Sequence, residues 1–199
     1  MERGVSLERA IELACEKPMS RRTEHIPLDA AHNRILAVGL HSKVDDPRFD
    51  NSAMDGFAVR ASDCDEAGAR LRIVGTSKAG GQDLPTVEAG EACRIMTGAR
   101  VPDGADAIVM VEDTEVRGES VSINGPARTN FIRRRAENLA RGQEALPTGT
   151  LLGPAELALA ATMGHGEIEV VVKPRIAIIS TGDELVRAGD ELAEGQIYE

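Results

Sequence analysis

Residues 93–111 read CRIMTGARVPDGADAIVMV. The stretch holds two short runs of apolar and β-branched residues, separated by a segment rich in Gly, Pro and Asp. This pattern is typical of short strands joined by turns. The same texture extends from about Val44 to about Ile132. Its clearest apolar runs are residues 71–74, 93–96, 107–111 and 121–123. We therefore expect an all-β segment of about 90 residues.

Helical patterns flank this segment. Residues 6–15 carry apolar side chains at helical spacing after Ser6, a good N-cap. A second short helix is expected at 28–37 and a third at 154–163, followed by a strand at 167–172.

The run RIAIIS at residues 175–180 is apolar on both faces, which is typical of a central parallel strand. Such a strand needs neighbouring strands and covering helices. The residues that follow Ser180 are too few for a βαβ unit of roughly 30 residues. We therefore expect the chain to be cut at the start of an α/β domain.

Composition excludes several classes of protein. The chain has 199 residues, 23 basic against 33 acidic side chains and 2% aromatic residues. A net charge of −10 argues against a general nucleic-acid binder, and few aromatics are available to stack on bases. No apolar stretch is long enough to span a membrane or to act as a secretory leader. Three widely spaced cysteines indicate reduced thiols in a cytoplasmic protein.

The segment DNSAMDGFAVR at residues 50–60 crowds short polar side chains ahead of Gly56. One interpretation is a capped tight turn at Asp55-Gly56, whose carboxylates bond local N–H groups. The other is that Asp55 presents its carboxylate to a cation or acts as a general base.

The segment RIMTGA at residues 94–99 ends a short strand in Thr97-Gly98. Gly98 permits close approach of the backbone, and the Thr97 hydroxyl with free N–H groups could meet a phosphate. The acidic residues that follow are better explained as a solvated strand end than as a metal site. They are Glu112, Asp113 and Glu115.

The segment IRRRAENLARG at residues 132–142 holds the densest basic cluster of an acidic chain. Its arginines are Arg133, Arg134, Arg135 and Arg141. Two interpretations stay open: salt bridges at helix ends or between domains, and capture of an anion by guanidinium groups.

The segment STGDEL at residues 180–185 follows the expected parallel strand, where open α/β sheets bind ligands. Ser180, Thr181 and Gly182 could bind a phosphate, with Glu184 near a Mg²⁺ ion. The alternative is that Thr181 or Asp183 caps the next helix.

Taken together, the four segments and the final GQIYE closely resemble the MoeA/gephyrin family of molybdopterin molybdenumtransferases. The resemblance covers essentially the whole chain. It implies an α+β multidomain fold: a helical linker domain with an inserted all-β domain, followed by the first strand of a truncated α/β molybdopterin-binding domain. The implied boundaries are 1–43 and 143–173 for the split linker domain, 44–142 for the insert and 174–199 for the incomplete α/β domain.

The resemblance also implies an activity in molybdenum cofactor biosynthesis. Family members insert molybdate into adenylylated molybdopterin, release AMP and require Mg²⁺. They are cytoplasmic homodimers that bind a pterin nucleotide, and molybdopterin adenylyltransferase and molybdoenzyme-maturation proteins are possible partners. Binding to nucleic acid or membrane is not expected. Because the family protein is about twice as long, this chain alone is expected to lack turnover.

Carried over residue by residue, the resemblance implies functional roles for Asp55, Thr97 and Glu184. Asp55 and Glu184 would hold Mg²⁺ or orient molybdate, and Arg133 would bind an oxyanion or phosphate. The chain departs from the family's GED at positions 136–138, where it has Ala136 and Asn138. Asn138 loses a negative charge, and Ala136 is expected to adopt ordinary backbone angles.

Two alternatives to this function remain. The first is a non-catalytic dimerisation or scaffold module of the gephyrin type, which would not need Asp55, Thr97 and Glu184. The second is insertion of tungsten in place of molybdenum, because the two oxyanions have nearly the same size and charge.

Overall fold

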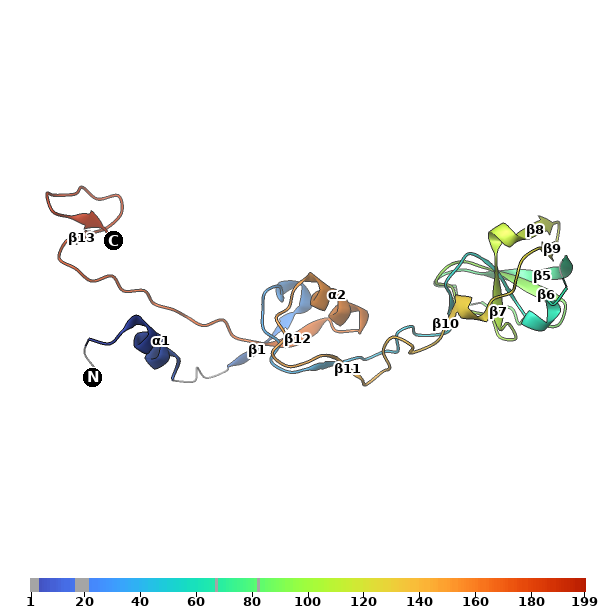
Figure 1. The fold of residues 1–199 in the computed structure, drawn as a ribbon, viewed down its shortest axis with the longest axis horizontal. Coiled ribbons are helices and arrows are strands. Elements are labelled where there is room, and N and C mark those ends of the chain that lie inside the picture. Colours follow the sequence, from blue (N-terminus) through green and yellow to red (C-terminus); the bar gives the residue numbers. More distant parts are fainter. Residues whose placement is uncertain (1–3, 17–21, 67, 82) are drawn as a thin grey trace. The chain divides into compact units, whose positions relative to one another are not determined.

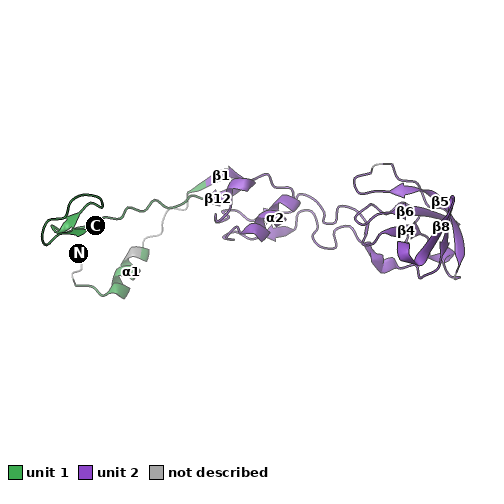
Figure 2. Cartoon of the chain, turned by 90° about the horizontal axis from the view of Figure 1, so that it is seen from above, with its two compact units in different colours: residues 1–23, 171–199 green, residues 24–170 purple. Residues whose placement is uncertain are grey.

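The structure is a computed structural model that describes residues 4–16, 22–66, 68–81 and 83–199. The chain divides into two compact units, one made of residues 1–23 and 171–199 and the other of residues 24–170 (Figure 2). The described part is mostly β with two α-helices. No helix within it is long and apolar enough to cross a membrane.

A six-stranded sheet forms the larger core of the second unit (Figure 1). Its strand order is β7-β4-β6-β5-β9-β8, and every pair is antiparallel except β5–β6. The strands are β4 (Gly56–Val59), β5 (Ala69–Ser77), β6 (Glu91–Ile95), β7 (Ala107–Met110), β8 (Thr114–Arg117) and β9 (Ser120–Ile123). The four apolar runs of the sequence lie in β5, β6, β7 and β9, so the expected strands are confirmed there.

Both faces of this sheet are buried at β4, β6 and β7. Successive side chains of a strand point to opposite faces. In β4, Phe57 and Val59 accordingly pack in one hydrophobic cluster and Ala58 packs in another. In β7, Val109 and Ile108 divide in the same way. Burial on two faces explains why these strands read as continuous apolar runs although the sheet is largely antiparallel.

A smaller core in the same unit is built around α2 (Pro154–Thr162). It includes two short strand pairs: β1 (Thr23–Pro27) with β12 (Glu167–Val171), and β2 (Leu40–His41) with β11 (Glu144–Leu146). The expected helix at 154–163 and the strand that follows are confirmed. Gly164 has φ +91°, the left-handed conformation that suits a glycine just after a helix.

The helix expected at residues 28–37 is wrong. Only η1 (Leu28–Ala30), a short 3₁₀ turn, forms there. Asn33 then takes φ 60°, and Ile35 and Leu36 form β-bridges with Leu151 and Val170. Apolar residues at helical spacing were misleading because their backbone groups bond to segments more than a hundred positions away.

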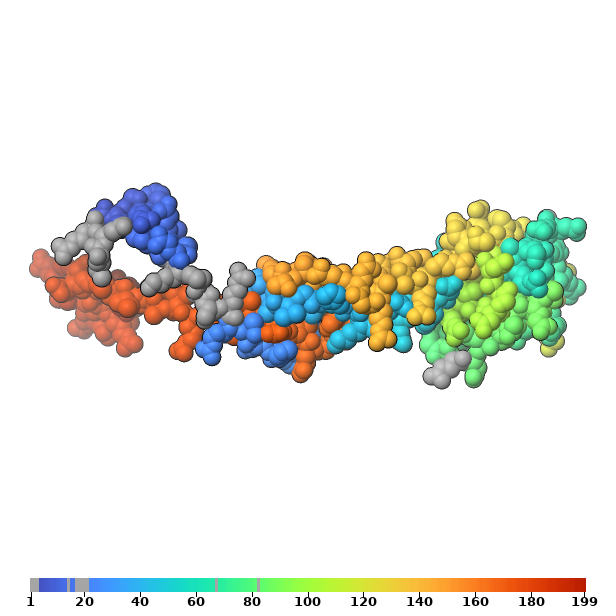
Figure 3. Space-filling view, turned by 90° about the horizontal axis from the view of Figure 1, so that it is seen from below, coloured from blue at the N-terminus to red at the C-terminus, as the bar shows by residue number. Residues whose placement is uncertain are grey.

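Two extended segments connect the smaller core to the sheet. Residues 42–50 and 133–143 lie side by side (Figure 3). Beyond them, β3 (Asn51–Ser52) pairs antiparallel with β10 (Ile132–Arg133). The remaining 3₁₀ turns of this unit are η2 (Ala61–Asp63), η3 (Val111–Asp113) and η4 (Thr129–Phe131).

The other unit contains α1 (Leu7–Cys15) and the pair β13 (Leu185–Val186) and β14 (Ile197–Tyr198). Helix α1 is confirmed with its cap, because the Ser6 hydroxyl oxygen accepts a hydrogen bond from Arg9 N at 3.2 Å.

The strand expected at residues 175–180 is wrong. These residues have no regular secondary structure, and Ile176, Ile178 and Ile179 are 81–91% exposed. A parallel strand forms only when a neighbouring strand satisfies its backbone groups. Among the described residues, none pairs with this run.

Candidate functional site

Asp55 and Thr97 meet at one end of the sheet. Gly56 in β4 lies opposite Ile95 in β6, so the residue before β4 comes beside the residues after β6. Asp55 Oδ1 accepts hydrogen bonds from Thr97 N at 2.6 Å and from Thr97 Oγ1 at 2.9 Å. Both side chains are exposed. Two positions 42 apart in the sequence are thus held together by the antiparallel register.

These bonds also set the charge state of Asp55. The Thr97 backbone N–H, the Thr97 hydroxyl and, more weakly, the Arg94 charge lower the pKa of the Asp55 carboxyl below its usual value. The group is therefore ionised at neutral pH. Within the described part of the chain, no donor reaches its second oxygen, Oδ2. The carboxylate is anchored through one oxygen and presents the other to solvent.

The two glycines of these motifs lie in different backbone environments. Gly56 does not form a turn; it belongs to β4, where an added Cβ would lie 1.9 Å from the Val109 carbonyl oxygen. Gly98 has a φ of +78°, which favours glycine, and an added Cβ there would meet no protein atom within 4 Å.

The phosphate-binding interpretation of the Thr97-Gly98 turn is also wrong. The three successive N–H groups are already used: Thr97 N donates to Asp55, Gly98 N to the Ser52 carbonyl at 2.8 Å and Ala99 N to the Met96 carbonyl at 2.9 Å. An anion-binding nest needs N–H groups that are free.

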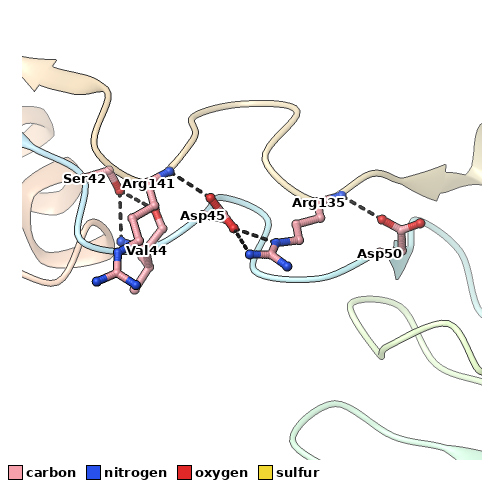
Figure 4. Close-up of polar contacts among 6 residues, drawn as sticks. All are labelled: Ser42, Val44, Asp45, Asp50, Arg135 and Arg141. Carbon is pink, nitrogen blue, oxygen red and sulfur yellow. Dashed lines mark hydrogen bonds and ion pairs between the residues drawn. The ribbon is translucent and has the colours of Figure 1, made fainter.

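The guanidinium groups of Arg134 and Arg135 have carboxylate partners, whereas those of Arg133 and Arg141 have no hydrogen bond or ion pair among the described residues. Arg134 pairs with Asp50 at 2.7 Å, and Arg135 pairs with Asp45 through Nε at 2.6 Å and Nη2 at 2.5 Å. Asp45 also accepts a hydrogen bond from Arg141 N at 2.8 Å (Figure 4). The salt-bridge interpretation therefore holds for Arg134 and Arg135, which join the two connecting segments.

Arg133 has a different environment. It lies opposite Asn51 in the β3–β10 pair, and its guanidinium has no hydrogen bond or ion pair among the described residues. It lines a cavity of about 350 Å³ together with Gly98, Asn51 and Asn138. Since Gly98 follows Thr97, the cavity begins one residue from the Asp55–Thr97 pair. The structure thus brings three of the expected site residues into one neighbourhood.

Asn51 was not predicted as a functional residue. It is 9% exposed, and its buried Oδ1 has no hydrogen-bond partner in the described structure. Most buried polar atoms in proteins are hydrogen-bonded, so this oxygen beside the cavity is available to a ligand or to a water molecule. The only sequence signal was its place among four short polar residues ahead of Gly56.

The departures at positions 136 and 138 have structural consequences. Ala136 has φ 62°, so the expectation of ordinary backbone angles is wrong: the alanine keeps a left-handed conformation. Its N–H donates to the Pro47 carbonyl at 2.9 Å, which holds the turn in place. Asn138 Nδ2 donates to Asp46 Oδ2 at 3.1 Å. A carboxylate at position 138 would instead face Asp46 with a like charge.

The STGDEL residues belong to the other compact unit. Ser180 and Thr181 are exposed, and the Gly182 carbonyl accepts a hydrogen bond from Leu185 N at 3.2 Å. The Glu184 carboxylate lies over Gly182, where an added Cβ would be 2.5 Å from Oε2. The helix-cap interpretation is wrong, because β13 follows this turn and not a helix.

The described residues contain no group of three or more His, Cys, Asp or Glu side chains able to hold a metal ion. Mg²⁺ commonly binds through one or two carboxylates plus substrate phosphates.

Comparison with known proteins gives a consistent result. Residues 5–164 match the family model described as MoeA N-terminal region (domain I and II). The chain is 41% identical over 182 residues to a molybdopterin molybdenumtransferase from Nostoc sp., covering 89% of this chain and 42% of that protein. It is 39% identical over 184 residues to the protein of the same name from Haemophilus influenzae, covering 92% and 45%.

A crystal structure of a molybdopterin biosynthesis MoeA protein from Pyrococcus horikosii is also similar. It matches with a TM-score of 0.83 and 35% identity, over 98% of this chain and 51% of that one. The chain thus spans less than half the length of the two curated relatives. By the family match and by these relatives, the chain belongs to the MoeA family, whose N-terminal region it contains.

Proposed function

We propose that this chain acts in molybdenum cofactor biosynthesis as the N-terminal part of a molybdopterin molybdenumtransferase. The reaction would insert molybdate into adenylylated molybdopterin and release AMP. Family membership and the names of the relatives support the reaction class. The observation that carries the proposal is the Asp55 carboxylate, ionised, anchored by Thr97 through one oxygen and open at the other.

Each of the proposed site residues would have a separate role. Asp55 would hold a cation through its free oxygen, and Thr97 keeps that carboxylate oriented. Arg133, without a protein partner among the described residues, supplies positive charge for molybdate or a phosphate. Glu184 would contribute a second carboxylate and Ser180, Thr181 and Gly182 an oxyanion contact, as the resemblance to the family implies.

The residues fit a magnesium ion that is bound together with substrate. Asp55 offers one free carboxylate oxygen, and Mg²⁺ commonly keeps waters and substrate phosphates as its other ligands. When bound, Mg²⁺ would neutralise phosphate charge. Asp55 and Glu184 would hold it.

The proposal includes the domain organisation implied by the family resemblance. Residues 1–43 and 143–173 would form a split linker domain, 44–142 an inserted β domain and 174–199 the start of an α/β molybdopterin-binding domain. The separate hydrophobic clusters around α2 and in the six-stranded sheet support the first boundary. A cytoplasmic homodimer that binds a pterin nucleotide completes the proposal. The relatives' names do not favour a scaffold role.

The test uses a chimera in which this chain replaces the matched N-terminal region of the Haemophilus influenzae relative. AMP release is measured with adenylylated molybdopterin, molybdate and Mg²⁺. We expect the chimera to be active and Asp55→Asn to lower its rate by about 100-fold or more. Glu112→Gln, which removes an exposed negative charge in η3, is the matched control and should leave the rate unchanged.

Two outcomes would contradict the proposal. The first is an inactive chimera under conditions where the relative itself releases AMP. The second is an Asp55→Asn chimera that keeps the parent rate, which would remove Asp55 from the site.

A further inference from the structure

A second, larger cavity of about 600 Å³ lies beside the connecting segments. Its walls carry Arg48, Arg100, Arg134 and Arg135, with Phe49 and Pro102 as apolar neighbours. We propose that this cavity binds a small molecule that carries a diphosphate group, at a site distinct from Asp55–Thr97 and from Arg133. Its volume lies within the range of small-molecule sites, roughly 300–1,000 Å³.

The charge of the cavity opposes that of the chain. Four guanidinium groups face two carboxylates there, Asp50 and Asp103, in a protein of net charge −10. A local positive site in an acidic protein attracts small anions against the overall negative charge of the chain. Guanidinium groups bind phosphate oxygens in a bidentate manner, which favours a phosphate over a simple halide.

Two of the arginines are available to a ligand. Arg48 has no hydrogen bond or ion pair within the described chain. Arg100 has one ion-pair contact, to Asp103 at 3.8 Å, and the Asp103 side chain is 84% exposed. A contact that long and that exposed contributes little, so an incoming phosphate could displace it.

The other two arginines give the cavity a fixed wall. Arg134 is held by Asp50 at 2.7 Å, and Arg135 is held by Asp45. A guanidinium that is already oriented loses less conformational freedom when it binds an anion, and this raises affinity. Arg134 uses Nη1 for Asp50, so its remaining N–H groups stay available.

The opposite wall, residues 100–105, is equally fixed. Val101 N donates to the Asp50 carbonyl at 2.9 Å, and Val87 N donates to the Asp103 carbonyl at 2.9 Å. Gly104 packs so closely on Val87 that an added Cβ would lie 2.2 Å from its carbonyl oxygen. The backbone of this wall is therefore held by the protein's own contacts.

The arginines next to one another in the sequence line different cavities. Arg133, the last residue of β10, lines the smaller cavity, and Arg134 and Arg135, which follow the strand, line the larger one. Arg48 contributes to both, whereas Arg100 contributes to the larger cavity alone. Arg100 and Arg133 thus form a matched pair for distinguishing the two sites.

The experiment is a titration of the 199-residue chain with pyrophosphate at low salt, followed by backbone amide chemical shifts. We expect saturable shifts at Val101, Gly104 and Arg135. Arg100→Gln should weaken binding by about tenfold, the loss of one charge-assisted contact. Arg133→Gln should leave the affinity within about twofold. Arg117→Gln, on the β8 edge strand, removes the same charge elsewhere and should also leave it unchanged.

Several results would overturn the proposal. One is a failure to saturate at millimolar pyrophosphate, and another is equal weakening by Arg100→Gln and Arg117→Gln, which would indicate general charge attraction. A third is saturable shifts confined to the Arg133 cavity. If Arg100→Gln disturbs the spectrum of the free protein, Arg48→Gln replaces it, because Arg48 has no described partner to lose. The result is independent of the proposed transferase activity, since only binding is measured.

Discussion

Ala136 provides a sharp test of the backbone geometry at the connecting segments. It has φ 62°, and of the non-glycine residues described only Asn33 shares a positive φ. The left-handed conformation costs a residue with a Cβ about 1–2 kcal/mol. Glycine avoids this strain but loses about 0.5–1 kcal/mol more conformational entropy on folding. Ala136→Gly should therefore stabilise the protein by about 0.5–1 kcal/mol.

The matched control is Ala140→Gly, an exposed alanine in the same connection with no positive φ. There glycine only adds freedom to the unfolded chain, so stability should fall by about 0.4–1 kcal/mol. The two alanine-to-glycine changes are thus expected to have opposite signs.

Urea unfolding followed by far-UV circular dichroism suits this chain, which has no Trp and one Tyr. Hydrogen exchange of the Ala136 amide, bonded to the Pro47 carbonyl, gives a local readout that should slow in Ala136→Gly. Equal destabilisation by both variants would refute the left-handed assignment at position 136.

Two further predictions concern the sheet and the connecting segments. Gly56→Ala places a Cβ 1.9 Å from the Val109 carbonyl oxygen, so it should lower the free energy of unfolding, measured in urea, by about 3 kcal/mol. An unchanged unfolding midpoint would contradict the close approach of β4 and β7. Hydrogen bonds from the Arg141 backbone N–H and the Arg135 side chain lower the pKa of Asp45, so its stabilising effect is present above about pH 4 and is lost as the pH falls through the lower folded-state pKa. Asp45→Asn should therefore make the urea midpoint of unfolding less sensitive to acid. An acid profile identical to that of the parent protein would show that Asp45 does not have this role.

Strands buried on two faces were predictable because their apolar runs are short and bounded by turn residues. The same reasoning failed at 175–180, where the apolar run is present but no described strand pairs with it. It also failed at 28–37, where hydrogen bonds to residues near Leu151 outweigh local helical spacing. Local pattern predicts an element only when the distant partner it requires is also there.

The site shows the same limit. Asp55 and Thr97 could be singled out individually, but their hydrogen bonds depend on the register of β4 and β6. The pairing of Arg135 with Asp45 spans 90 positions, and no spacing rule connects such residues. The left-handed Ala136 was missed because alanine gives no signal for that conformation. Arg48 was missed because it matters only as part of a cavity wall. Asn51 was missed because its significance lies in a buried Oδ1 that has no hydrogen-bond partner among the described residues.

The pairing of β3 with β10 also bears on the order of folding. Gly39 N donates to Thr148 Oγ1, 109 positions further along the chain, in the smaller core. Closing a loop of that length from a disordered chain carries an entropic penalty that grows by about 0.6 kcal/mol with each doubling of length. Once the six-stranded sheet has formed, Asn51 and Arg133 are already adjacent, and only short segments remain to be closed. The smaller core is thus expected to form after the six-stranded sheet, with pairing that spreads outward from β3 and β10.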